Sequence, residues 1–497
     1  MISLFGRGKP DHPMADARQA RRLLDELPPR DPVKALGDLA HWHESVAATP
    51  DFRPEARIEL LLMIDAAAQE RVKKVTLEYL APARLSRFQE NRLWTAVHGY
   101  WREAALAMAR AVDLFLQGGK GAERARAQLP ALLAAALRAL AQQIKWAYLR
   151  YGPNDPVVWG AFNRVYGFAE AQGLAGAQSA PRTEFLRGLM LSASAPECLL
   201  PAQLEITEKL LAQYAPLLEL APAGGEDLPF WTDVQRPMVP LRASRLLQPG
   251  PGVRYFGAGR ALAGLASLQE RVRASPALQA DLGLGAPMER EDALELIGHL
   301  RKCWSPQTPE RRHRRHAVKS RLGVVNGLAG AIEALDQESS LSFDGGGAEN
   351  WVVENVSAGG FGALVTQTKG DWLRVGALLA LQPEGGSNWL VGVVRRVHRT
   401  SGAQARVGIE TLAKSPQIVR LSLGASVSGA LETGLLLRAD GPAAAEMRIA
   451  LRPGVFAPGL NLESRVGGRQ HIYMPARIGE RGDDYEIGRF REMVRDE

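Results

Sequence analysis

Two short segments stand out in this 497-residue chain: Glu310-Arg311-Arg312-His313-Arg314-Arg315-His316 and Glu354-Asn355-Val356-Ser357-Ala358-Gly359-Gly360-Phe361-Gly362. The window from Arg301 to Val325 holds eight Lys or Arg and one acidic residue, so its net charge of +7 equals that of the whole chain. The rest of the chain is therefore neutral in sum. Clustered guanidinium groups concentrate anions and bind phosphate oxygens in a bidentate way. The first segment is therefore interpreted as a local anion site.

The second segment supplies directional groups that arginines lack. Asn355 and Ser357 are two residues apart, so on a strand their side chains share one face and can converge on a ligand. Gly359, Gly360 and Gly362 let the backbone turn or approach a ligand without a Cβ in the way. Taken singly, each segment also has an ordinary interpretation, because arginine runs are often solvated faces and Asn, Ser and Gly all favour turns.

Together, Arg311-x-x-x-Arg315 and Asn355-x-Ser357-x-x-Gly360 resemble the two-part signature of the PilZ domain, a small β-barrel that binds the bacterial second messenger cyclic di-GMP. The resemblance implies that the arginines lie on a flexible lead-in segment that folds over the ligand and contacts phosphates and guanine edges. It implies that the second motif contacts guanine and phosphate from a barrel strand. The nucleotide-binding residues so implied are Arg311, Arg312, Arg315, Asn355, Ser357, Gly359, Gly360 and Gly362.

The resemblance covers about residues 305–420. Three strand-like runs follow the glycines, at Leu373–Leu381, Trp389–Val397 and Ala405–Leu412. One departure is the 39 residues, 316–354, that separate the two motif halves, which is longer than the family's usual gap. An insertion at Asp344-Gly345-Gly346-Gly347 and a site that no longer binds ligand are both open explanations.

The fold class expected is multidomain α+β. An all-helical domain at 1–225 precedes a linker at 226–304 with short extended segments and two helices. A PilZ-like antiparallel β-barrel at 305–420 is followed by a smaller β-rich domain at 421–497. This last part is interpreted as a second small barrel or sheet, with a degenerate copy of the first barrel as one alternative. Its candidate strands are Ala430–Leu437, Glu446–Leu451, Asn461–Val466 and His471–Ile478.

The helical prediction rests on apolar residues at helical spacing. Leu60, Met63 and Ile64 begin one stripe, and further stripes run through Leu93–Ala111 and Leu133–Ala147. Asn154-Asp155-Pro156 is typical of a capped helix start with proline in the first turn. No family is assigned to this domain.

Composition excludes several classes of protein. Apolar residues at 46% and charged residues at 23% are ordinary for a soluble globular chain. With only Cys198 and Cys303, neither a disulfide framework nor a cysteine metal site is expected, which fits a reducing cytoplasm. The Met1–Pro13 segment is not typical of a secretory signal, and Leu129–Ala141 is too short to span a bilayer, so no membrane span is expected.

No catalytic residue, metal site or cofactor is predicted. His41 and His43 would point about 200° apart on a helix, so they are interpreted as surface or boundary residues rather than ligands of one metal. Four tryptophans, Trp94, Trp101, Trp146 and Trp159, sit among apolar residues at helical spacing and are assigned to core packing. The sequence shows no nucleophile with an evident base.

The leading hypothesis is a cytoplasmic cyclic di-GMP receptor that signals through its helical domain to an unidentified protein partner, in bacterial motility or biofilm regulation. A PilZ-like helical adaptor that has lost its ligand is the alternative, favoured by the long gap before Asn355. Nucleic acid binding is disfavoured, because contact along a phosphate backbone needs a wide basic surface, and the chain outside the Arg301–Val325 window is neutral in sum.

Overall fold

The structure is a computed structural model that describes residues 10–81, 85–118, 122–246, 248–275, 288–308, 310, 313–337, 348–386, 388–400, 404–423, 431–438 and 447–496. The chain divides into two compact units. The first, called the helical unit, comprises Met1–Arg150, Asn154–Pro196 and Pro201–Pro309. The second, called the barrel unit, comprises Tyr151–Pro153, Glu197–Leu200 and Glu310–Glu497.

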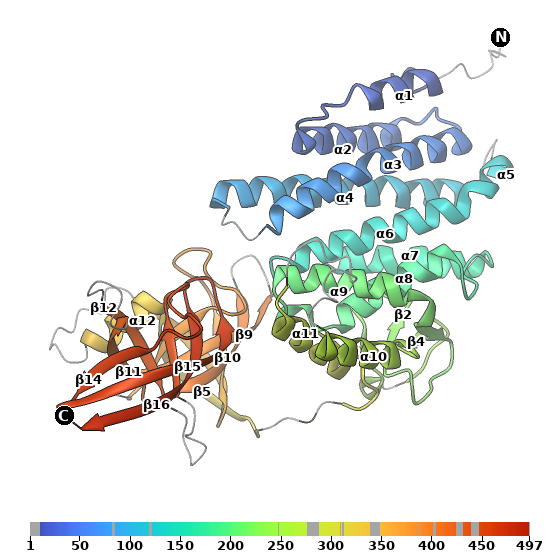
Figure 1. Cartoon of the computed structure of the whole chain (residues 1–497). Helices are drawn as coiled ribbons and strands as arrows, with labels where there is room; N and C mark the ends of the chain where they lie inside the picture. The colour runs from blue at the N-terminus through green and yellow to red at the C-terminus, as the bar shows by residue number, and fades with distance from the viewer. Residues whose placement is uncertain are drawn as a thin grey trace, which may run out of the picture. The chain divides into compact units, whose positions relative to one another are not determined.

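The helical unit begins with stacked helices. Figure 1 shows them following one another in chain order, from blue α1 to green α9. Within the stack, α2 packs on α3 and α4, α4 packs on α6, and α6 packs on α8. The helices are α1 (Ala17–Asp25), α2 (Pro32–Ala48), α3 (Pro54–Tyr79), α4 (Arg87–Leu116), α5 (Ala122–Ala125), α6 (Leu129–Tyr148), α7 (Pro156–Ala171), α8 (Ala180–Ala193) and α9 (Pro201–Tyr214).

Local sequence explains where these helices begin. Ser86 and Gln89 form a capping box at the start of α4, so two otherwise unpaired backbone donors are satisfied. The Asp155 carboxylate accepts the Val157 amide at 2.8 Å, and Pro156 is the first residue of α7, as the sequence predicts. Of the four tryptophans, Trp101, Trp146 and Trp159 are buried. Trp94 is half-buried, and its indole N–H donates to the Trp146 carbonyl.

Residues 219–304, most of which the sequence analysis assigned to a linker, also lie in the helical unit. Four short strands form a sheet in the order β1-β4-β2-β3. Two helices follow within the described residues of this region. The bounds are β1 (Glu219–Ala221), β2 (Phe230–Asp233), β3 (Leu241–Arg242), β4 (Val253–Gly257), α10 (Ala261–Ala274) and α11 (Arg290–Trp304).

The first barrel closes in the order β10-β7-β6-β5-β8-β9. Helix α12 (Leu328–Gln337) lies between β5 and β6, so a strand and a helix occupy much of the long gap between the motif halves. The insertion considered at Asp344-Gly345-Gly346-Gly347 lies outside the described residues. The strands are β5 (His316–Asn326), β6 (Glu349–Ser357), β7 (Gly360–Val365), β8 (Leu378–Pro383), β9 (Leu390–Arg399) and β10 (Ala405–Ala413).

The tail forms a second closed barrel, in the order β11-β12-β13-β16-β15-β14. With the helical region and the first barrel, it confirms the fold class expected from the sequence. The first and last strands were not among the expected ones. The bounds are β11 (Gln417–Leu423), β12 (Leu431–Leu437), β13 (Met447–Leu451), β14 (Leu462–Val466), β15 (Arg469–Arg481) and β16 (Glu486–Asp496).

The two barrels share an apolar core within their unit. Residues of β8 alternate between cores: Leu379 lies inside the first barrel, and Leu378 packs outward with Leu435 and Tyr485 of the second. The Tyr485 hydroxyl donates to the Gly376 carbonyl at 2.9 Å. Arg395 of β9 donates to Glu480 of β15 at 2.6 Å. The second barrel therefore covers the outer face of the first around β8.

Two short segments from the first half of the chain belong to the barrel unit. Tyr151 is 6% exposed in the core of the first barrel, and its backbone φ of 54° lies in the left-handed region. Its hydroxyl accepts the Val375 amide at 3.2 Å, and its carbonyl accepts the Arg399 amide at 2.9 Å. The Glu197 carboxylate forms an ion pair with Arg396 of β9 at 3.0 Å.

Across the described residues, no helix combines the length and apolar character needed to cross a bilayer.

His43 corrects one expectation, because it is fully buried on α2 rather than at the surface or boundary. Its ring lies 5.7 Å from that of Tyr100, and neither ring nitrogen has a hydrogen-bond partner among the described residues. Burial lowers the pKa of His43 from 6.5 to about 3. The unfolded chain therefore binds this proton below about pH 6.5, whereas the folded chain resists it until about pH 3.

The free energy of unfolding of the helical unit should consequently fall as the pH drops below 6.5. The contribution of His43 to this fall is up to about 1.4 kcal/mol for each pH unit. His43→Leu should remove this contribution, which amounts to about 2 kcal/mol at pH 5. Calorimetric unfolding of the full chain at pH 8 and pH 5 measures it. His41→Leu, on the exposed side of α2, is the matched control. An unchanged pH dependence in His43→Leu would contradict the assignment.

Candidate functional site

The Asn-x-Ser motif ends strand β6, and the glycines begin strand β7. The hairpin pairs Asn355 with Gly362 and Ser357 with Gly360, so each motif side chain faces a glycine across the ladder. Both side chains are half-buried. The Ser357 hydroxyl donates to the Gly360 carbonyl at 3.4 Å, a long hydrogen bond that a ligand oxygen can replace.

Gly362 is required by the position of the Asn355 amide. A Cβ at Gly362 would lie 2.6 Å from Nδ2 and 2.7 Å from Oδ1 of Asn355. Any larger residue would therefore push the amide off the strand. Because residue 362 has no side chain, the Asn355 amide can lie flat against the outer face of the barrel.

Gly360 is required by the barrel backbone. Its φ of 147° is one that other residues rarely adopt, and a Cβ there would lie 1.9 Å from the Ile409 carbonyl oxygen. Neighbouring Gly359 accepts the Thr411 amide at 3.0 Å. These contacts attach the end of the hairpin to strand β10 and fix where Ser357 sits.

The arginine lead-in reaches the same hairpin. Arg311 and Arg312 lie outside the described residues. Arg315 is exposed and directly precedes His316, whose register partner on β6 is Val356. The His313 ring lies over Gly359, because a Cβ at that glycine would be 2.9 Å from the ring Cδ2. The structure thus brings the described part of the lead-in, Arg315 included, to Asn355, Ser357 and the glycines.

A polar group on the neighbouring strands was not predicted from the sequence. Arg406 of β10 pairs in register with His398 of β9, and its Nε lies 3.5 Å from the Glu354 carboxylate. Burial lowers the pKa of His398, with Glu197 opposing that change and Arg396 and Arg406 adding to it. These residues share no short motif. Only their strand registers bring them together.

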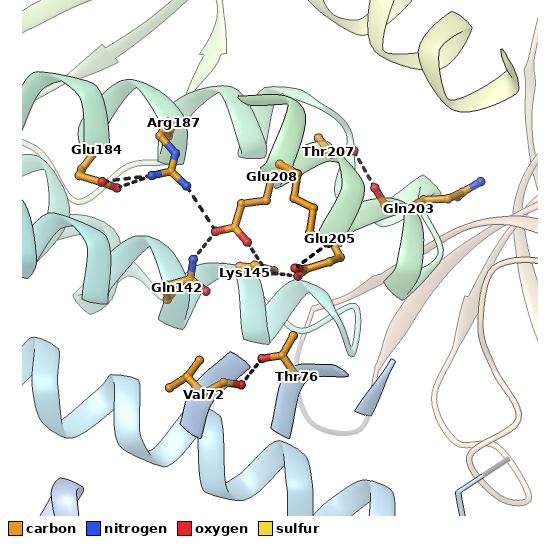
Figure 2. A network of polar contacts seen from close by, with 11 residues as sticks. Val72, Thr76, Gln142, Lys145, Glu184, Arg187, Gln203, Glu205, Thr207 and Glu208 are labelled. Atoms are coloured by element: carbon orange, nitrogen blue, oxygen red, sulfur yellow. Dashed lines mark hydrogen bonds and ion pairs between the residues drawn. The ribbon is translucent and has the colours of Figure 1, made fainter. Parts of the chain in front are cut away.

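A denser cluster of charges lies in the helical unit (Figure 2). Lys145 of α6 is 3% exposed and forms ion pairs with Glu205 and Glu208 of α9. Gln142 donates to Glu208, and Arg187 of α8 lies 3.1 Å from Glu184. Burial alone would lower the pKa of Lys145, but Glu208 and Glu205 outweigh it and raise that pKa.

Burial would likewise raise the pKa of Glu208, but Lys145 and Arg187 outweigh it and lower that pKa. These ion pairs join α6, α8 and α9 through charges that neutralise one another. The cluster is therefore structural. Within the part of the chain that the structure describes, no group of three or more His, Cys, Asp or Glu is placed to hold a metal ion.

Two family models match the chain. Residues 18–223, which span helices α1 to α9, match the model described as cyclic-di-GMP receptor FimW, N-terminal domain. Residues 349–417, which span strands β6 to β10, match the model described as cyclic-di-GMP receptor FimW, middle PilZ domain. The second match includes Asn355 to Gly362 and begins after the arginine lead-in. No curated protein matches the chain.

The PilZ resemblance drawn from the sequence is confirmed, and the helical domain that the sequence left unassigned gains a family. The two matches follow each other in the order that their descriptions give, and together they span more than half of the chain. This chain therefore belongs to the cyclic-di-GMP receptor FimW family, and its first barrel is a PilZ domain.

Proposed function

We propose that the outer face of the first barrel binds cyclic di-GMP and that the helical unit passes the bound state to a protein partner. The binding residues are those of the two motifs: Arg311, Arg312, Arg315, Asn355, Ser357, Gly359, Gly360 and Gly362. The chain acts as a receptor in the bacterial cytoplasm, with no chemistry performed on the nucleotide.

One observation carries this proposal. The β5–β6 register pairs His316 with Val356. Arg315, which directly precedes β5, therefore lies beside Ser357 in the sheet. His313 already lies against Gly359. A ligand bound at the Asn355 side chain would therefore lie within reach of the guanidinium groups of the lead-in.

The energetics favour a ligand with two phosphates. Like charges at neighbouring arginines repel one another, and a dianion removes that repulsion. Each charge-assisted hydrogen bond contributes about 1.5 to 3 kcal/mol, against the cost of ordering the lead-in. Asn355 and Ser357 add directional contacts that do not depend on charge.

A second candidate is an adaptor whose barrel binds no nucleotide. It is favoured by the start of the PilZ match at residue 349, which leaves the arginine lead-in outside the matched region. Titration of the full chain with cyclic di-GMP, with GTP and with a random oligonucleotide separates these functions. Saturable binding of cyclic di-GMP alone is expected. Binding of none of the three would favour the adaptor, and preferential oligonucleotide binding would favour nucleic acid recognition.

Arg311→Ala and Arg315→Ala should each weaken cyclic di-GMP binding by about tenfold or more, because each loses a charge-assisted contact of about 1.4 kcal/mol or more. Isothermal titration of each variant measures the change. Arg420→Ala is the matched control, since Arg420 is an exposed arginine on β11 of the second barrel. Normal affinity in both variants would show that the lead-in does not contact the ligand.

The Asn355 half of the site should respond differently to salt. Gly362→Ala displaces the Asn355 amide and Asn355→Ala removes it, so both should reduce affinity while keeping the salt dependence of the unaltered chain. Arg315→Ala should flatten that dependence, because it removes a charge that salt screens. Titrations at low and high ionic strength give the slopes. Equal slopes in all three variants would refute this division of roles.

A further inference from the structure

A row of register partners crosses four strands of the first barrel. Asn355 of β6 pairs with Gly362 of β7, Gly362 pairs with Gly408 of β10, and Gly408 pairs with Arg396 of β9. Register partners point to the same face, and the neighbouring residues Ala363 and Val407 point into the barrel core. The row therefore lies on the outer face, and three strand spacings make it about 14 Å long.

The middle of this row has no side chains of its own. Gly362 is covered by the Asn355 amide, which leaves Gly408 between that amide and Arg396. At Gly408 a Cβ would meet one described atom within 4 Å, the Arg396 Cβ at 3.2 Å. Glycine inside a strand costs stability and often marks either a β-bulge or a place where a ligand or another chain segment approaches closely. Gly408 borders the register shift between β10 and β9, and its outer side is also open. Among the described residues, no backbone atom lies within 4 Å of the position that a Cβ of residue 408 would take.

The far end of the row carries an exchangeable ion pair. The Arg396 side chain is 54% exposed, and its Nη2 lies 3.0 Å from Oε1 of Glu197. Such partly exposed pairs contribute little to stability, so a better partner can replace the carboxylate. The neighbouring Arg406 and His398 add positive and polar character to the same face.

We infer that Arg396 is a further ligand-binding residue, which exchanges Glu197 for the O6 and N7 edge of one guanine of cyclic di-GMP. This inference rests on the proposed function and extends its site past the two motifs. Both atoms of that guanine edge are acceptors, which suits the parallel N–H groups of a guanidinium. Adenine presents an amino donor in place of O6, so Arg396 selects guanine over adenine.

The exchange has a consequence for the rest of the chain. Glu197–Leu200 belongs to the barrel unit, whereas the residues before and after it in sequence belong to the helical unit. Glu197 itself lies in η2 (Pro196–Cys198), which α9 follows in the chain. A ligand that takes Arg396 from Glu197 removes one contact between this segment and the first barrel. Nucleotide binding thereby reaches the helical unit through the chain itself.

The test compares cyclic di-GMP with cyclic di-AMP on the full chain. Arg396→Ala should weaken the binding of cyclic di-GMP about tenfold or more and leave the affinity for cyclic di-AMP nearly unchanged. The ratio of the two affinities should therefore fall by the same factor. Arg396→Gln should also lose discrimination, since glutamine pairs with adenine. Glu197→Gln should tighten cyclic di-GMP binding by about two- to fivefold, because the competing carboxylate is neutralised.

Arg420→Ala serves as the charge-matched control, and thermal unfolding checks that each variant is folded. Unchanged affinity and discrimination in Arg396→Ala, with binding lost in Arg315→Ala, would overturn this inference and leave the proposed function standing. Absence of cyclic di-GMP binding by the unaltered chain would overturn both. Weaker binding by Glu197→Gln would show that Glu197 assists the ligand, which contradicts the exchange.

Discussion

The antiparallel pairing of β5 with β6 is the constraint on which the candidate site depends. Its register places His316 opposite Val356, and so brings a basic lead-in against the hairpin that bears Asn355 and Ser357. A slip of one residue would turn the side chains of β5 to the opposite face of the barrel. The register is held by apolar residues such as Leu322 and Trp351, which are partners in the ladder and pack together inside the barrel.

Glycine shapes this face for three separate reasons. Gly360 lies where the Ile409 carbonyl leaves no room for a side chain, and Gly362 lies where the Asn355 amide does. Gly408 is different, because only the Arg396 Cβ approaches its vacant position among the described atoms. Packing explains the first two, whereas Gly408 borders the register shift between β10 and β9.

The two units hold their charges in different ways. In the helical unit, Lys145 is buried and Glu208 is half-buried, and their charges neutralise one another where two helices pack. On the first barrel, Arg315 and Arg396 stay exposed, so their charges remain accessible to an anion or a guanine edge. Charge therefore contributes to helix packing in one unit and stays at the surface in the other.

The sequence by itself determined the helical region and the PilZ barrel, because periodicity, caps and a short signature are local properties of the chain. Strand β16 was missed because a strand rich in charged residues lacks a clear apolar alternation. Strand β11 was missed where it crosses the boundary expected after residue 420. The burial of His43 and the association of Arg396 with Glu197 were decided only by the tertiary structure. Helix packing sets the first. The second depends on the inclusion of Glu197–Leu200 in the barrel unit, which joins residues about two hundred positions apart, and no local pattern encodes such a contact.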